Sequence, residues 1–198
     1  MPAANNIEWH QVEAMTEYCK QRQEWRNLLI LLIPCTSGYR HCDWQKLRWC
    51  DVMGASIKRV EQKTDKRRDA PLTKYVSDQI QAAFDAIQAT IPPSQRPAMA
   101  KDFIFKPVSK NSSTGVLTRA GVNGILDKIR KAVGIPHTVT VHSLRKAYGM
   151  RLYTIMGETE SAMIWISNWF NHSSLQITQR YLGLETKMRA EIMDQMWR

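Results

Sequence analysis

The chain has 198 residues, a formal net charge of +10 and a pI near 9.6, with 43% hydrophobic and 23% charged residues. This length and composition are ordinary for one globular domain, whereas the excess of lysine and arginine favours a polyanionic partner, most commonly nucleic acid. No stretch approaches the roughly 18 apolar residues that cross a bilayer, so we expect no membrane contact.

The start of the chain and its cysteines indicate a reducing compartment. The first ten residues, MPAANNIEWH, lack the basic start and the apolar centre of a signal peptide. The cysteines form no CxxC pair, and His41 beside Cys42 has no second ligand pair at zinc-site spacing. We therefore expect reduced thiols, no bound metal and a cytoplasmic location.

The first half of the chain predicts helices followed by a small sheet. Apolar residues recur near helical spacing in residues 7–34, which indicates one or two helices, and Gly38 is a natural helix end. A further helix is expected from Tyr39 to Leu47. Residues 56–72 are basic and rich in turn formers, and we interpret them as a hairpin or a three-stranded sheet.

The second half predicts a series of amphipathic helices. Val76 to Ile87 shows a clean helical stripe, and Thr118 can cap a helix that Gly134 closes. Between these two helices we expect a proline-rich linker, a short strand and a polar loop, at residues 92–97, 103–105 and 106–115. Four more helices are expected near residues 141–156, 159–170, 174–182 and 184–197. The predicted fold class is mainly α with a small antiparallel sheet.

Arg40 and Asp43 lie one helical turn apart in the segment TSGYRHCDWQKLRWCDV, residues 36–52, with Leu47 as an anchor on the same helix. A guanidinium held by a carboxylate just after a helix break can present its fork to a phosphate. The alternative interpretation is an exposed ion pair that binds nothing.

Lys63 lies beside a predicted turn at residues 64–65 in the basic segment QKTDKRRDAPL. A lysine at a hairpin tip can enter a DNA groove and deliver a proton to a departing oxygen, although a solvated basic loop has the same composition. Lys66 competes for this role, because the register of a hairpin tip is hard to read from sequence. The candidate contacts to DNA phosphates are Lys66, Arg67, Arg68 and Lys146.

Four further side chains in the last third of the chain suit phosphate chemistry. His142 and Arg145 are spaced i, i+3 near a helix N-terminus, so both can point at one anion. His172 precedes two serines that can cap the next helix, and Tyr181 lies near the end of that helix. Taken singly, a core histidine and a packed tyrosine are the ordinary interpretations.

In this order the residues resemble the motifs of the tyrosine recombinase (phage integrase) family. The segment GYRHCDWQKLRWCD is similar to the family pattern G-x-R-x-x-D/E-x-x-x-L-x-W-x-D, in which Arg40 matches the first catalytic arginine. On the same resemblance, the hairpin lysine, the HxxR pair, the His/Trp position and the nucleophile match Lys63, His142 with Arg145, His172 and Tyr181. The resemblance covers residues 7–198.

The resemblance implies a site-specific DNA recombinase or integrase of the kind found on mobile elements. Tyr181 would form a 3′-phosphotyrosine, without metal or ATP, while Arg40, Arg145 and His172 hold the non-bridging oxygens. His142 would act as acid and base for the tyrosine, and Lys63 would protonate the leaving 5′-oxygen. The implied partner is double-stranded DNA at a specific site, bound by a homotetramer in the nucleoid; a monomer without DNA is compatible.

This chain departs from the family pattern at residues that would support the catalytic side chains, not at the catalytic positions themselves. Phe170-Asn171-His172 stands where the family usually has Leu-Gly-His, and asparagine tolerates the left-handed backbone that glycine adopts. The family usually has glutamate at the position of Asp43, which we expect to support Arg40. The family's N-terminal DNA-clamping domain has no counterpart here, so residues 1–198 are expected to form a single catalytic domain, either an excised fragment or a minimal enzyme.

Two other functions stay open, namely a type IB topoisomerase-like enzyme and a non-catalytic basic DNA-binding regulator. The RWCD segment and the short hairpin favour the recombinase over the topoisomerase. The last helix, with an apolar stripe from Leu184 to Met196, either closes the core, as base rates favour, or docks on a neighbouring protomer.

Overall fold

The structure is a computed structural model that describes residues 7–107 and 115–196. The expected polar loop at 106–115 falls largely outside these residues. In chain order the elements are α1 (Trp9–Gln21), α2 (Trp25–Ser37), α3 (His41–Trp44), η1 (Trp49–Asp51), β1 (Ser56–Val60), β2 (Arg67–Pro71), α4 (Lys74–Ala89), η2 (Pro93–Lys101), α5 (Arg119–Ala132), α6 (Val141–Ile155), α7 (Glu160–Trp169), α8 (Leu175–Leu182) and α9 (Leu184–Met196). The predicted fold class, mainly α with a small sheet, is confirmed.

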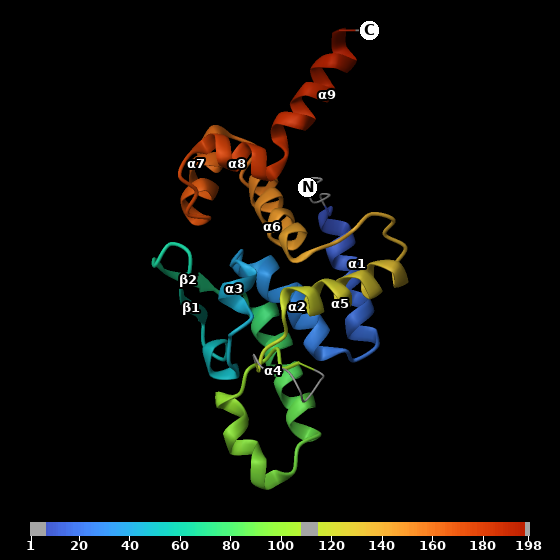
Figure 1. Ribbon diagram of the computed structural model, residues 1–198, viewed down its shortest axis with the longest axis vertical. Coiled ribbons are helices and arrows are strands. Elements are labelled where there is room, and N and C mark those ends of the chain that lie inside the picture. The colour runs from blue at the N-terminus through green and yellow to red at the C-terminus, as the bar shows by residue number, and fades with distance from the viewer. Residues whose placement is uncertain (1–6, 108–114, 197–198) are drawn as a thin grey trace.

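Helix α2 is the centre of the main core. Its apolar run from Leu28 to Ile33 is buried throughout, and α1, α4 and α6 pack around it (Figure 1). A helix that is apolar on every side is stable in water only when neighbours enclose it, which explains this central place. The helix ends at Gly38, whose φ of 62° lets its N–H reach the Pro34 carbonyl.

The sheet is one antiparallel hairpin. Strands β1 and β2 pair from Ser56 opposite Pro71 to Val60 opposite Arg67. The short strand expected at residues 103–105 is reduced to a single bridge between Phe103 and Arg48. Within the described residues the hairpin interpretation is therefore confirmed, and the three-stranded alternative is wrong.

Hydroxyl caps fix where the later helices begin. Thr118 accepts a hydrogen bond from the Gly121 N–H at the start of α5, and Ser174 accepts one from the Ile177 N–H at the start of α8. Both caps were expected from the sequence. Helices α7 and α8 then enclose a second, smaller core whose buried residues are Met163, Ile166, Phe170 and Leu182.

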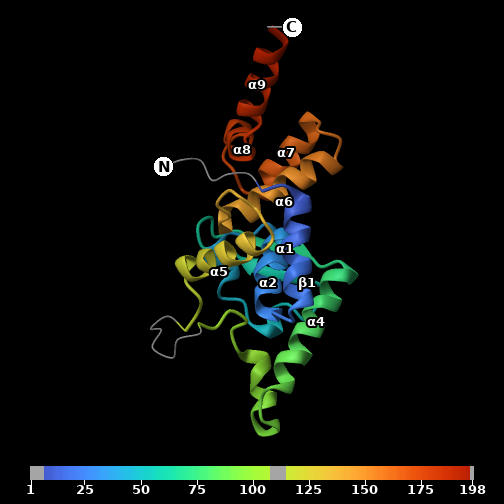
Figure 2. The same ribbon diagram turned by 90° about the vertical axis from the view of Figure 1, so that its right-hand side faces the viewer.

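Helix α9 projects away from both cores (Figures 1 and 2). Ile192, Met193 and Met196 are 44%, 58% and 69% exposed. Gly183, with a φ of 79°, ends α8, and the chain changes direction there before α9 begins. The expectation that this helix closes the core is therefore wrong. No described helix is both long enough and apolar enough to cross a membrane.

Candidate active site

Arg40 lies between α2 and α3, where the chain runs extended after Gly38. One edge of its guanidinium donates from Nη1 to Glu61 Oε2 at 3.0 Å, and Nη2 donates to the Phe170 carbonyl at 3.2 Å. Its side chain is 18% exposed, so the group is fixed in place yet open to solvent on one side. The carboxylate that holds Arg40 is therefore Glu61, which the sequence did not single out.

Arg145 lies one turn into α6 and is almost fully buried. Its Nη1 donates to the Gly38 carbonyl at 2.5 Å and its Nη2 to the Phe170 carbonyl at 3.1 Å, while the guanidinium stacks over the Phe170 ring at 4.2 Å. Burial lowers its pKa to about 10, which still leaves it charged at neutral pH. Arg40 and Arg145, 105 positions apart in the printed sequence, thus converge on one carbonyl oxygen.

His172 follows a sharp turn at the end of α7. Asn171 adopts a φ of 52°, and the His172 N–H then donates to the Ser167 carbonyl at 3.0 Å. Its Nδ1 lies 2.9 Å from the Thr178 hydroxyl, which leaves Nε2 to face a ligand. Burial, and then the charges of Arg145 and Arg40, lower its pKa to about 4, so the imidazole is neutral at pH 7.

Tyr181 lies in the last turn of α8, against the same group of side chains. Its ring meets those of His172 and Phe170 edge-on, with centroids 5.2 Å and 5.8 Å apart. The hydroxyl is buried beside the guanidinium of Arg145. Burial raises the pKa of the phenol above its ordinary value, although the neighbouring guanidiniums of Arg145 and Arg40 offset part of this rise. The positive charge at this point favours a phenolate once a base takes the proton.

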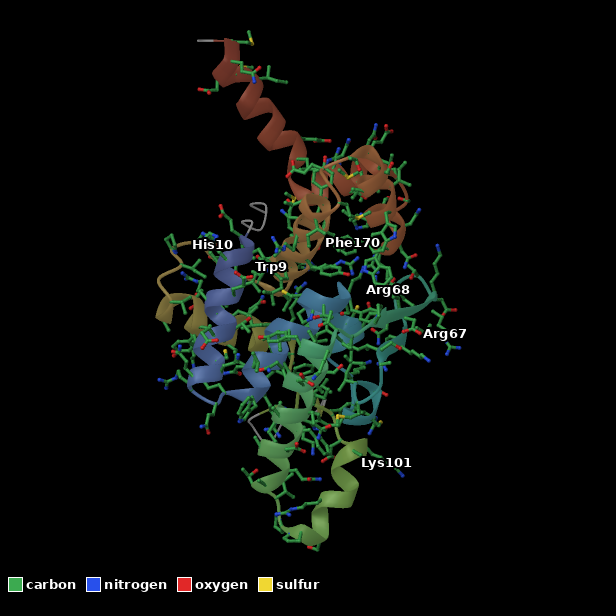
Figure 3. The ribbon with its side chains drawn as sticks, turned by 180° about the vertical axis from the view of Figure 1, so that it is seen from behind. Trp9, His10, Arg67, Arg68, Lys101 and Phe170 are labelled. Atoms are coloured by element: carbon green, nitrogen blue, oxygen red, sulfur yellow. The ribbon has the colours of Figure 1, made fainter. Side chains whose placement is uncertain are left out.

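The hairpin between β1 and β2 presents its basic residues to solvent. Lys63, Lys66 and Arg67 are all exposed, and Figure 3 shows Arg67 pointing outward from the strand. The charge of Lys63 contributes to the lowered pKa of His172, which favours Lys63 over Lys66 as the lysine that faces the site.

His142 lies in the first turn of α6 and is exposed. Although part of the side chain is exposed, partial burial of its ring, and then the charges of Arg119 and Arg145, lower its pKa, which favours the neutral form that can accept a proton. His41 is its neighbour: burial, Arg119 and His142 together lower the pKa of His41 to about 4. From the sequence, His41 was interpreted only as a possible metal ligand, and Arg119 was not singled out.

Asp43 has a different role from the one expected. Its carboxylate is buried, and Oδ1 accepts a hydrogen bond from the Gln62 backbone N–H at 2.8 Å. Asp43 therefore ties the start of α3 to the hairpin turn, and the expectation that it holds Arg40 is replaced by the Arg40–Glu61 pair.

Two of the expected DNA contacts are buried instead. Arg68 is 8% exposed, and its Nη1 and Nη2 donate to the Trp169 and Ser37 carbonyls at 2.6 Å and 2.9 Å. Figure 3 shows Arg68 on the side of the hairpin that faces the second core, to which Phe170 belongs. Lys146 is 9% exposed. Burial leaves little of either side chain to reach a duplex on the surface, so direct DNA contact by these two residues stays a prediction.

Comparison with known proteins identifies relatives across most of the chain. A model of the phage integrase family matches residues 5–188. The tyrosine recombinases XerC of Agrobacterium fabrum and Rhizobium meliloti are 29% and 24% identical over 170 residues, which is 85% of this chain and 49% of each relative. The chain thus spans about half the length of these curated relatives.

Solved structures show the same fold at low identity. XerA recombinase superposes with a TM-score of 0.69 and 17% identity over 98% of this chain and 64% of its own. XerH bound to a palindromic difH substrate, in a post-cleavage complex, gives 0.68 and 19% over 98% and 54%. A lambda integrase tetramer bound to a Holliday junction gives 0.61 and 14% over 91% and 48%.

Proposed function

Because this chain belongs to the phage integrase family of tyrosine recombinases, we propose that it is a site-specific recombinase that cuts and rejoins DNA strands through a covalent 3′-phosphotyrosine at Tyr181. The observation that carries the proposal is the convergence of Arg40 and Arg145 on the Phe170 carbonyl, beside the His172 and Tyr181 rings. Two fixed cations, a neutral imidazole and a phenol at one point suit transfer of a phosphoryl group.

In the proposed reaction, a non-bridging phosphate oxygen takes over the donors that Arg40 and Arg145 direct at the Phe170 carbonyl. The two guanidiniums and His172 Nε2 then stabilise the charge that accumulates in the transition state. The bond from the Tyr181 oxygen to phosphorus forms as the bond to the 5′-oxygen breaks.

The proton transfers have assigned partners in this proposal. His142 receives the phenol proton, and Lys63 supplies a proton to the leaving 5′-oxygen. The phosphotyrosine conserves the energy of the phosphodiester, so a 5′-hydroxyl from another strand can reverse the step without ATP or metal. Double-stranded DNA is the proposed partner because the chain carries a net charge of +10 and exposes Lys63, Lys66 and Arg67 on the hairpin.

We also propose that the enzyme acts as a homotetramer on DNA, in which α9 of one copy docks on the next. An apolar groove of about 750 Å³ between α1, α4, α6 and α7 is lined in part by Trp9, Tyr148, Leu152 and Trp165. Three exposed side chains at the end of α9, those of Ile192, Met193 and Met196, are apolar as well. A second copy of this helix is the occupant whose chemistry matches the groove, and lambda integrase forms a tetramer on a Holliday junction.

The test of the proposed function is a covalent trap. The chain is incubated with labelled duplexes that carry a randomised core and a single nick, and adducts are resolved on a denaturing gel. Wild type is expected to form an adduct, and Tyr181→Phe is expected to form none while it binds the same duplexes. No adduct with wild type would indicate a non-catalytic regulator, and strand relaxation without exchange between two duplexes would indicate a topoisomerase.

A further inference from the structure

A buried carboxylate lies among the cations of the site without a part in the proposed reaction. The side chain of Glu61, which directly follows β1, is 0% exposed. A negative charge at this place repels a phosphate, and a buried ion is expensive unless it is paired. Its presence therefore needs a compensating reason, which its contacts supply.

Glu61 joins segments that are far apart in sequence. Its Oε2 accepts hydrogen bonds from Arg40 Nη1 at 3.0 Å, Asn171 Nδ2 at 2.9 Å and the Thr64 hydroxyl at 2.9 Å. Its Oε1 lies 3.1 Å from Nη1 of Arg68 in an ion pair. One carboxylate thus holds the phosphate-facing arginine, the hairpin tip, the second strand and the turn that precedes His172.

The Asn171 side chain links Glu61 to that turn, although its backbone conformation is unfavourable for most residues other than glycine. Its φ of 52° lies in the left-handed region, where glycine is at ease and most other residues are not. Glycine would suit this backbone better but has no amide to donate to Glu61. The side chain at position 171 is therefore explained by the contact with the carboxylate rather than by the turn.

We propose that Glu61 and Asn171 form a positioning pair, which fixes Arg40, the hairpin that carries Lys63 and the turn that carries His172 in one arrangement for strand cleavage. This inference rests on the function proposed above. The pair touches no reacting atom; it acts by holding one edge of the Arg40 fork, so that the other edge stays aimed at the phosphate.

The charge of Glu61 separates this role from a purely structural one. Glu61→Gln keeps the size of the side chain, but leaves one acceptor oxygen and turns an NH₂ group towards donors on Arg40, Arg68 or Asn171. The variant also removes the negative charge nearest the site. DNA should therefore bind as tightly as before or more tightly, while cleavage slows because the fork of Arg40 is no longer fixed.

Asn171→Gly is the complementary variant. It deletes the amide and at the same time relieves the left-handed backbone, so a loss of activity would not come from strain in the turn. Gln23→Gly is the matched control, because Gln23 has a similar φ of 55° in the exposed turn between α1 and α2, away from the site. It should cleave at the wild-type rate.

The experiment uses a nicked duplex selected with wild type from the randomised pool. Adduct formation is timed under single-turnover conditions at saturating protein, and affinity for the same duplex is measured by fluorescence anisotropy. Glu61→Gln and Asn171→Gly should each slow cleavage by roughly ten- to a hundredfold with no weakening of affinity. Because they break one shared contact, the double variant should be slower by less than the product of the two effects.

Two results would overturn the inference. One is cleavage by either variant within twofold of wild type, and the other is a parallel fall of affinity and rate, which a merely structural role predicts. A wild-type chain that forms no adduct with any duplex would instead remove the proposed function, and this inference with it. Adduct formation by the wild-type chain therefore distinguishes failure of the positioning role from failure of the proposed function.

Discussion

Replacing Arg145 by lysine keeps the positive charge of the site but removes the planar fork. The guanidinium is 3% exposed, donates to the Gly38 and Phe170 carbonyls and stacks on the Phe170 ring. A lysine ammonium is a compact charge that cannot reach two separate carbonyls with the same geometry. We therefore expect Arg145→Lys to impair both the fold around Phe170 and cleavage.

The magnitude follows from the contacts that are lost. A hydrogen bond to a charged group contributes about 1.5–3 kcal/mol, and the ammonium can retain one of the two. The free energy of unfolding should therefore fall by about 1.5–3 kcal/mol, which lowers the melting temperature by on the order of 3–12 °C in a domain of this size. Cleavage should slow by roughly 10²–10³-fold, because one fixed donor to the transition state is lost.

Single-turnover adduct formation, measured well below the melting temperature, separates the effect on chemistry from the effect on stability. Arg26→Lys is the matched control, because Arg26 is exposed in the first turn of α2, at the opposite end of that helix from Gly38. It should change neither quantity appreciably. A cleavage rate for Arg145→Lys within threefold of wild type would refute the role of the guanidinium fork.

Three further predictions address the turn, the imidazole and the last helix. Gly38→Ala should lower the free energy of unfolding by about 1–3 kcal/mol or more in urea denaturation, because its backbone is left-handed and an added Cβ would lie 2.8 Å from the Phe170 ring. The pKa of His172 is lowered from 6.5 to about 4, so the unfolded chain binds a proton at higher pH than the folded one; stability should fall as pH drops from 6.5 to 4, and less steeply in His172→Asn. Ile192→Lys combined with Met196→Lys should leave the melting temperature of the free chain unchanged, since both side chains are exposed, but reduce the mass of the DNA-bound assembly in sedimentation.

The helices could be predicted because their signals are local. A continuous apolar run marked α2, and the hydroxyl residues Thr118 and Ser174 marked the starts of α5 and α8. Side-chain period and capping depend on neighbours within one or two turns, so a sequence contains them in full. The packing of α9 could not be predicted from local signals, because an apolar stripe can pack equally well against the core or against a partner.

The burial of Arg68 in the hairpin was not predicted, although a signal for it was present in the sequence. Residues two apart in a strand face the same side, so Arg68 must face inward with Ala70 once Ala70 is placed in the core. The run of basic residues outweighed this period. Glu61 is one of three acids in residues 56–72, and its link to Asn171, 110 positions along the chain, has no local signal in the sequence.

The Phe170 carbonyl accepts hydrogen bonds from the guanidiniums of Arg40 and Arg145 in the absence of a ligand. When a phosphate oxygen replaces this carbonyl as the acceptor, the number of hydrogen bonds stays the same. The binding free energy then comes mainly from the negative charge of the phosphate. An uncharged linkage such as a methylphosphonate lacks this charge, so it would have no electrostatic advantage over the neutral Phe170 carbonyl. We therefore expect the site to discriminate between anionic and neutral linkages through the main chain at Phe170.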